Sequence, residues 1–295
     1  MNKQHFGNTD SLLAWYFVVI WGSGFIATKI GLQYAAPFTF LSLRFAFGLI
    51  CLIPLVWWVK PSWPGSGREW LQIIVAGLLM HAIHLSGSHY AQYLGMSAGI
   101  AAVILALQPL ATAIIAVGWF HERPTRVQWL GIALGFLGVA LIVWHKIDVR
   151  AATAGSLIAV TIGLAALTAG TLYQRRFCPN VDLRSGALIQ FAASFIVLAP
   201  MSIMFESGKI EWTWPLLGSI AFLVLLASLL GVNALHTLMR RGEATRVTSM
   251  MYLPPIFAVA IEYLWFGLAP SAISIAGIII TSLGVALAMR RRMMS

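Results

Sequence analysis

The 295-residue chain contains 60% hydrophobic residues but only 9% charged residues, and its formal net charge is +10. A water-soluble domain carries roughly 25% charged residues, so this composition excludes a soluble globular protein and indicates a chain that lies in lipid. A basic chain can bind nucleic acid, but no cluster of basic and aromatic residues occurs in a polar segment.

Apolar runs of about 20 residues, the length that crosses a bilayer, follow one another with short polar breaks. Ten runs predict ten transmembrane helices, at 12–32, 37–59, 70–93, 97–119, 126–145, 153–174, 184–204, 213–238, 244–266 and 271–290. The first run lacks a convincing cleavage site, so we expect a helix there and no removable signal peptide. The sequence therefore predicts an all-α, multi-pass protein of the inner membrane.

Lysine and arginine are unevenly distributed between the predicted loops. With the N-terminus inside, the outer positions are Lys29, Lys146, Arg150 and Lys209, and Arg44 lies within a helix. The other fourteen basic residues are on the inside, at Lys3, Lys60, Arg68, Arg123, Arg126, Arg175, Arg176, Arg184, Arg240, Arg241, Arg246, Arg290, Arg291 and Arg292. Because basic residues concentrate on the cytoplasmic side of membrane proteins, both termini are predicted to be cytoplasmic. This distribution explains the basic charge without a nucleic-acid partner.

The two halves of the chain resemble each other at one ungapped offset of 146 residues. The offset aligns Pro54 with Pro200 and Pro109 with Pro255, and it aligns two copies of the sequence LGVAL, which begin at Leu137 and Leu283. Matches that join the second run to the fifth at a single offset are hard to obtain by chance, even in apolar sequence. We therefore predict an internal repeat.

Residues 1–146 and 147–295 each contain five predicted helices. An odd number of crossings means that the second half enters the membrane upside-down relative to the first. Inverted repeats related by an axis in the membrane plane are a recurring architecture of secondary transporters. Two near-equivalent halves can rock between inward-open and outward-open states, so we expect a transport pathway between them.

Two patterns resemble EamA-type proteins of the drug/metabolite transporter superfamily. They are the sequence WGSGF at 21–25, followed by Arg44-Phe45, and the sequence FHERPT at 120–125. The resemblance covers nearly the whole chain and implies ten helices in an inverted five-plus-five repeat that exports small metabolites or amino acids. Overall similarity indicates a YddG-like exporter of aromatic and other neutral amino acids, although no single motif dictates an aromatic substrate. The second half reads FGLAP at 266–270, without an acidic counterpart of Glu122, so Glu122 is interpreted as a loop or packing residue.

The third run contains a polar stripe of His81, His84, Ser88 and Gln92 at helical spacing. Polar residues inside a membrane are costly and usually face a bundle interior or a watery cavity. The stripe either lines a cavity and bonds the amino and carboxylate groups of a substrate, or its imidazoles bond carbonyl groups of neighbouring helices. We favour the cavity, with His81 and His84 as the leading candidates.

Pro109 and Pro255 occupy equivalent places in the fourth and ninth runs. A proline inside a helix frees a carbonyl and favours a kink, and broken helices near the membrane midplane often bind ligands in transporters. A passive bend that improves packing is the alternative, but the matched positions favour a cavity-shaping role. The predicted substrate-binding set is Trp21, Gly24, His81, His84, Leu85, Ser88, Gln108, Pro109, Thr168, Thr171, Tyr252 and Pro255.

Arg44 lies about seven residues inside the second run, too deep to reach water easily. It could hold a substrate carboxylate, bind helix-end carbonyls, or pair with Glu262, the only acidic residue in the ten predicted spans. We favour a structural role for Arg44 and expect Lys29 to extend outward to the interface. Small-residue faces on the fifth and tenth runs are predicted to pack against each other, at Gly131, Gly135, Gly138, Gly277, Thr281 and Gly284.

Catalytic motifs are missing from the sequence, which has no HExxH, nucleophile elbow or Walker loop. Cys51 and Cys178 have no partners for a disulfide or a metal site. We therefore expect no enzyme activity, no cofactor and no metal, but a monomer whose partners are a small-molecule substrate and the bilayer. An exporter of drugs or other amphipathic metabolites and a non-transporting scaffold are the alternatives. Proton coupling stays open, since Glu262 and the histidines are the only titratable candidates.

Overall fold

The computed structural model describes residues 8–119, 124–148, 152–231, 253–267 and 269–288. Within these ranges the chain forms helices and their connections, and it contains no β-strand beyond an isolated antiparallel bridge between Ala35 and Ile210. The prediction of an all-α protein is confirmed for this part of the chain.

The helices of the first half are α1 (Asn8–Gly31), α2 (Pro37–Val59), α3 (Gly67–Gly77), the π-helical segment η1 (Leu78–Ile83), α4 (His84–Tyr93), α5 (Ala98–Leu105), α6 (Gln108–Trp119) and α7 (Arg126–Asp148). The described helices of the second half are α8 (Ala154–Phe177), α9 (Leu183–Phe205), α10 (Trp214–Ala221), the π-helical segment η2 (Phe222–Gly231), α13 (Pro254–Phe266) and α14 (Ala272–Ala288). Helices α8 and α9 begin and end 146 residues after α1 and α2, so the repeat extends to the helix boundaries.

Five helical stretches in the described residues are long and apolar enough to cross a membrane: 37–59, 67–93, 98–118, 154–177 and 183–205. Shorter apolar helices cover Arg126–Ile142, Trp214–Leu230, Pro254–Phe266 and Ala272–Ala288. The side chains of Trp57 and Leu264 are 81% and 80% exposed, as expected where lipid replaces water as the solvent. Ten crossings and cytoplasmic termini stay predictions.

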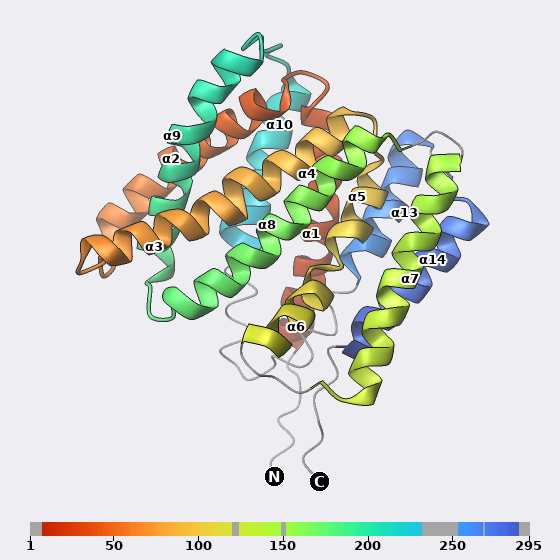
Figure 1. The fold of residues 1–295 in the computed structure, drawn as a ribbon. Coiled ribbons are helices and arrows are strands. Elements are labelled where there is room, and N and C mark those ends of the chain that lie inside the picture. Colours follow the sequence, from red (N-terminus) through yellow and green to blue (C-terminus); the bar gives the residue numbers. More distant parts are fainter. Residues whose placement is uncertain (1–7, 120–123, 149–151, 232–252, 268, 289–295) are drawn as a thin grey trace.

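The helices pack mainly in pairs that join the two halves. Helix α7 lies beside α14 at one edge of the molecule, whereas α2 and α9 lie at the opposite edge (Figure 1). Between these edges, α1 packs against α13 and α4 packs against α8. The interface between the halves therefore runs through the middle of the bundle.

The contact between α7 and α14 confirms the prediction from the small-residue faces. A Cβ atom on Gly131 would lie 2.6 Å from the carbonyl oxygen of Gly284, and one on Gly138 would lie 2.6 Å from that of Gly277. Real Cβ atoms do not approach backbone so closely, so only glycine permits this helix spacing. The pair forms a scaffold beside the central helices.

Candidate functional site

The third helix of each half contains a π-helical segment at an equivalent position. The offset of 146 residues carries η1 (78–83) to 224–229, which lies within η2. A π-helical turn disrupts the regular hydrogen bonding of an α-helix, and such segments are frequent at functional sites. The candidate site is therefore built around η1 and η2.

Two predicted histidines join η1 and α4 to helices of the second half. Nε2 of His81 lies 3.1 Å from Oε1 of Gln190 on α9, and Nδ1 of His84 lies 3.0 Å from the carbonyl oxygen of Gly163 on α8. Both are hydrogen bonds between helices, as expected if the histidines serve helix packing, which was the interpretation that the sequence favoured less. Ser88 is buried beside Gly163, so the part of the stripe formed by these three residues holds the halves together.

Arg44 on α2 reaches η2, the π-helical segment of the other half. Its Nη2 donates to Oγ of Ser228 at 3.2 Å. The repeat equivalent of Arg44 is Gln190, which contacts η1 through His81. The second helix of each half thus contacts the π-helical segment of the other half, and these two polar contacts follow the internal pseudo-symmetry.

The structure places both predicted prolines in the first turn of a helical segment. The fourth span is interrupted at residues 106–107, and Pro109 is the second residue of α6; Pro255 is likewise the second residue of α13. At a helix start, proline has no hydrogen-bonding N–H to lose and its φ angle suits the helix. Pro109 thus follows an interruption within the helical stretch 98–118, whereas residues 232–252 lie outside the described part of the chain, so a kink at Pro255 stays a prediction.

The structure brings some of the other predicted residues together. Nε2 of Gln108 donates to Oγ1 of Thr171 at 3.3 Å, which links α6 to α8. Thr168 is buried and donates to the carbonyl group of Leu164 in its own helix.

The remaining predicted residues are scattered. Trp21 is 40% exposed and packs against Phe17, with ring centroids 5.0 Å apart. Leu85 packs into the cluster between α2 and α9, and Gly24 faces Leu223 of η2. Tyr252 lies outside the described residues.

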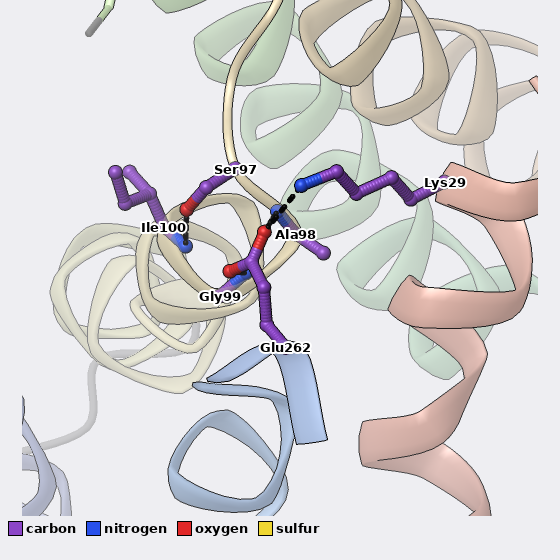
Figure 2. A network of polar contacts seen from close by, with 6 residues as sticks. All are labelled: Lys29, Ser97, Ala98, Gly99, Ile100 and Glu262. Carbon is purple, nitrogen blue, oxygen red and sulfur yellow. Dashed lines mark hydrogen bonds and ion pairs between the residues drawn. The ribbon is translucent and has the colours of Figure 1, made fainter. Parts of the chain in front are cut away.

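A charged network that the sequence analysis did not predict ties α1, α5 and α13 together (Figure 2). Nζ of Lys29 lies 2.7 Å from Oε1 of Glu262. The backbone N–H groups of Ala98 and Gly99, at the start of α5, donate to the same carboxylate at 2.9 Å each. The partial positive charge of a helix N-terminus favours a carboxylate there, so Glu262 is held by three donors from the first half.

The prediction that Lys29 extends outward to the interface is therefore wrong, and Glu262 pairs with Lys29 and not with Arg44. The ammonium group of Lys29 lies 4.5 Å from the centroid of the Phe266 ring, and the side chain is 23% exposed against 5% for Glu262. The flexible stem of lysine reaches across to α13, where an ion pair and a cation–π contact replace hydration.

A cavity of about 370 Å³ adjoins this network, lined by residues that include Lys29, Ser97, Val259, Glu262 and Ser274. Its volume lies in the range of small-molecule sites, about 300–1,000 Å³. We call this end of the bundle the Lys29 end; the charge distribution predicts that it faces outward.

Glu206, which follows α9, makes a second tie between the halves at the Lys29 end. Its carboxylate accepts hydrogen bonds from the N–H groups of Phe38 and Thr39, at 2.9 and 2.8 Å, at the start of α2. The N–H group of Glu211 donates to the carbonyl oxygen of Tyr34 at 2.9 Å. The Lys29 end is therefore held together by contacts between the halves.

The chain matches the EamA-like transporter family twice, over residues 10–144 and 153–290. The chain belongs to this family. It is 26% identical to "Uncharacterized transporter YvbV" of Bacillus subtilis (87% of this chain, 84% of the relative). It is also 26% identical to "Uncharacterized inner membrane transporter YedA" of Escherichia coli (82% and 78%). These findings identify an EamA-like, multi-pass transporter of the inner membrane.

A further relative, "Probable amino-acid metabolite efflux pump" of Salmonella typhimurium, is 23% identical over 94% of this chain and 93% of its own length. A solved crystal structure shares the fold, with a TM-score of 0.67, 17% identity, and coverage of 95% of this chain and 96% of the other. The EamA-like family and these relatives point to transport and not to catalysis.

The two interpretations of the histidine stripe predict different results for the bond between His81 and Gln190. If the bond only joins helices of this EamA-like transporter, the substitutions His81→Ala and Gln190→Ala lower the thermal unfolding temperature in detergent but leave transport per folded molecule unchanged. If His81 also faces the pathway, as we predict, His81→Ala lowers transport about 10-fold or more, the loss expected for a hydrogen bond of about 1.5 kcal/mol. Gln190→Ala then leaves transport much less affected. Equal transport by the two variants would assign His81 to helix packing alone.

Proposed function

We propose that this protein exports small metabolites, in the first place aromatic and other neutral amino acids, by alternating access through a pathway between its two halves. The observation that carries this proposal is the pseudo-symmetric crossing of polar contacts, from Arg44 to η2 and from Gln190 to η1. It concentrates polar groups at the interface of two inverted halves, where transporters bind their cargo. The amino-acid class rests on the resemblance to YddG-like exporters and on the efflux-pump relative.

The contacts at the Lys29 end suggest how the two states differ. Alternating access requires one end of the pathway to be closed while the other is open. In this structure, Lys29, Glu206 and Glu262 tie the halves together at the Lys29 end. We infer that these contacts hold that end closed and must break when the cargo leaves. The working unit in this proposal is a monomer in the bilayer.

Transport by the purified protein in liposomes tests this function. Liposomes preloaded with unlabelled phenylalanine are expected to accumulate labelled phenylalanine by exchange, and the same assay is run with tryptophan and threonine. Protein-free liposomes are the control. No exchange of any of the amino acids would refute the proposed substrate class. Imposing a pH gradient or a membrane potential then separates coupled from uncoupled transport, since flux that ignores both excludes proton coupling.

A further inference from the structure

Arg44 is a cation inside the bundle, and no acidic side chain among the described residues pairs with it. Its one hydrogen bond there is to the hydroxyl group of Ser228, which itself donates to the carbonyl oxygen of Leu223 at 2.9 Å. Nε of Arg44 is enclosed and has no hydrogen-bond partner. Burying a charge without a counter-charge is costly, so an anion bound here would stabilise the guanidinium.

The acidic residues that the structure describes near the membrane are engaged elsewhere. Glu262 is held by Lys29 and the start of α5, and Glu206 is held by the start of α2. Asp182, at the start of α9, accepts a hydrogen bond from its own helix. Among the side chains that the structure describes, no ion pair joins Arg44 to a carboxylate.

Other polar groups with unused hydrogen bonds lie on the helix that faces Arg44. The ring of His89 on α4 packs beside Phe40, one turn from Arg44, with centroids 5.8 Å apart. Nε2 of His89 and both polar atoms of the Gln92 amide have no hydrogen-bond partner among the described residues, although these two residues are only 2% and 7% exposed. Buried polar groups without partners are rare in native proteins, and an absent ligand or water is a common explanation.

Neighbours of Arg44 on α2 contact two histidines of the candidate site. The ring of Phe45 lies 6.1 Å from that of His81, and the ring of Phe40 lies 5.8 Å from that of His89. Arg44 is half-buried as a whole residue, and its Nε is enclosed. Guanidinium presents a planar set of donors that matches the two oxygens of a carboxylate.

We propose that Arg44 binds the carboxylate group of the transported molecule, and that the protein therefore selects cargo that carries a carboxylate. This inference deepens the proposed function and rests on it. The sequence alone favoured a structural role for Arg44, but a structural arginine has its donors satisfied by carbonyl groups or acidic residues, and within the described part of the chain Arg44 bonds only a hydroxyl group. A molecule without an acidic group leaves the guanidinium without a counter-charge and is expected to bind more weakly.

Ligand binding to the purified protein tests the proposal without relying on transport. The probes are phenylalanine, phenylalanine amide and 3-phenylpropionate, titrated against the thermal unfolding temperature in detergent. In the wild type, the two carboxylates are expected to bind at least about 30-fold more tightly than the amide, the effect of losing one partner of a charged hydrogen-bonded pair. Arg44→Gln is expected to weaken both carboxylates by a similar factor and to change binding of the amide less than 3-fold.

Two further variants separate binding from folding. Glu69→Ala removes an exposed carboxylate that bonds the N–H group of Gly65 in its own loop, so carboxylate affinity should stay within about 3-fold. Arg44→Lys keeps the charge and should bind carboxylates more tightly than Arg44→Gln does. If Arg44→Gln does not fold, the comparison of acid with amide in the wild type and the Arg44→Lys affinity still decide the question.

Several outcomes would overturn the proposal: equal binding of acid and amide by the wild type, equal losses for both in Arg44→Gln, or no binding of either carboxylate. The amino-acid assignment fails separately. If 3-phenylpropionate binds through Arg44 but liposomes exchange no amino acid, the carboxylate site stands and the proposed cargo is wrong. If Arg44→Gln exchanges phenylalanine as the wild type does, the role of Arg44 is wrong and the proposed function stands.

Discussion

Glu262→Ala is expected to destabilise the protein by about 3 kcal/mol or more, since removing one partner of a buried ion pair costs about 3–5 kcal/mol. The substitution strands the ammonium group of Lys29 and leaves the N–H groups of Ala98 and Gly99 without their acceptor. The double variant Lys29→Met/Glu262→Ala should be less destabilised than Glu262→Ala, because no uncompensated ammonium remains. Thermal unfolding in detergent measures both effects.

The matched control is Glu69→Ala, which removes an exposed carboxylate that bonds the N–H group of Gly65 in its own loop. Its effect should not exceed about 1 kcal/mol, the usual value for a helix-terminal contact of this kind. If Glu262→Ala is no more destabilising than this control, the ion pair contributes little to the fold.

The Glu262→Ala variant also tests whether the charged network of Lys29 and Glu262 closes the Lys29 end. Ser274 lines the adjoining cavity, so Ser274→Cys reports its accessibility, in a background where Cys51 and Cys178 are replaced by serine. A membrane-impermeant maleimide should label this cysteine faster from the outer side when Glu262→Ala is added. Unchanged labelling would show that the ion pair is a structural contact and no part of a gate.

The sequence predicted those features that depend on local composition. The boundaries of α2, at residues 37 and 59, agree with the apolar run, because Pro37 favours a helix start and Lys60 is the first charged residue after it. The packing of α7 on α14 was predictable because glycine spacing by itself indicates where backbones meet. The 146-residue repeat was visible because both halves keep prolines and glycines at the same places.

The contacts of the charged residues were not predictable in the same way. Lys29 and Glu262 are 233 residues apart in the sequence, and their pairing depends on how α1 and α13 lie in space. Hydropathy indicated that both residues were costly in a membrane but not which partner each had. Pro109 indicated a break in the fourth run, but residues 106–107 are apolar, so hydropathy did not show where α5 ends and α6 begins.

Substitution of Gly284 is expected to destabilise the protein strongly. Whether Gly284→Ala lowers or raises the unfolding temperature tells whether the close contact of α7 with α14 or helix propensity decides the effect. An alanine Cβ at Gly284 would lie 2.7 Å from the carbonyl oxygen of Gly131 and would also overlap the backbone of Gly135. Neither contact is with a flexible side chain, so α7 and α14 must separate along their length. Overpacking of this kind costs about 1–3 kcal/mol, and we expect Gly284→Leu to prevent accumulation of folded protein.

The matched control is Gly218→Ala in α10, where an added Cβ atom meets nothing within 4 Å. Alanine favours a helix over glycine by up to about 1 kcal/mol, so Gly218→Ala should raise the unfolding temperature while Gly284→Ala lowers it. Helix propensity alone would make both substitutions stabilising. Opposite signs therefore measure the close approach of α7 and α14 directly, and stabilisation by both would mean that the two helices are not in backbone contact in the membrane.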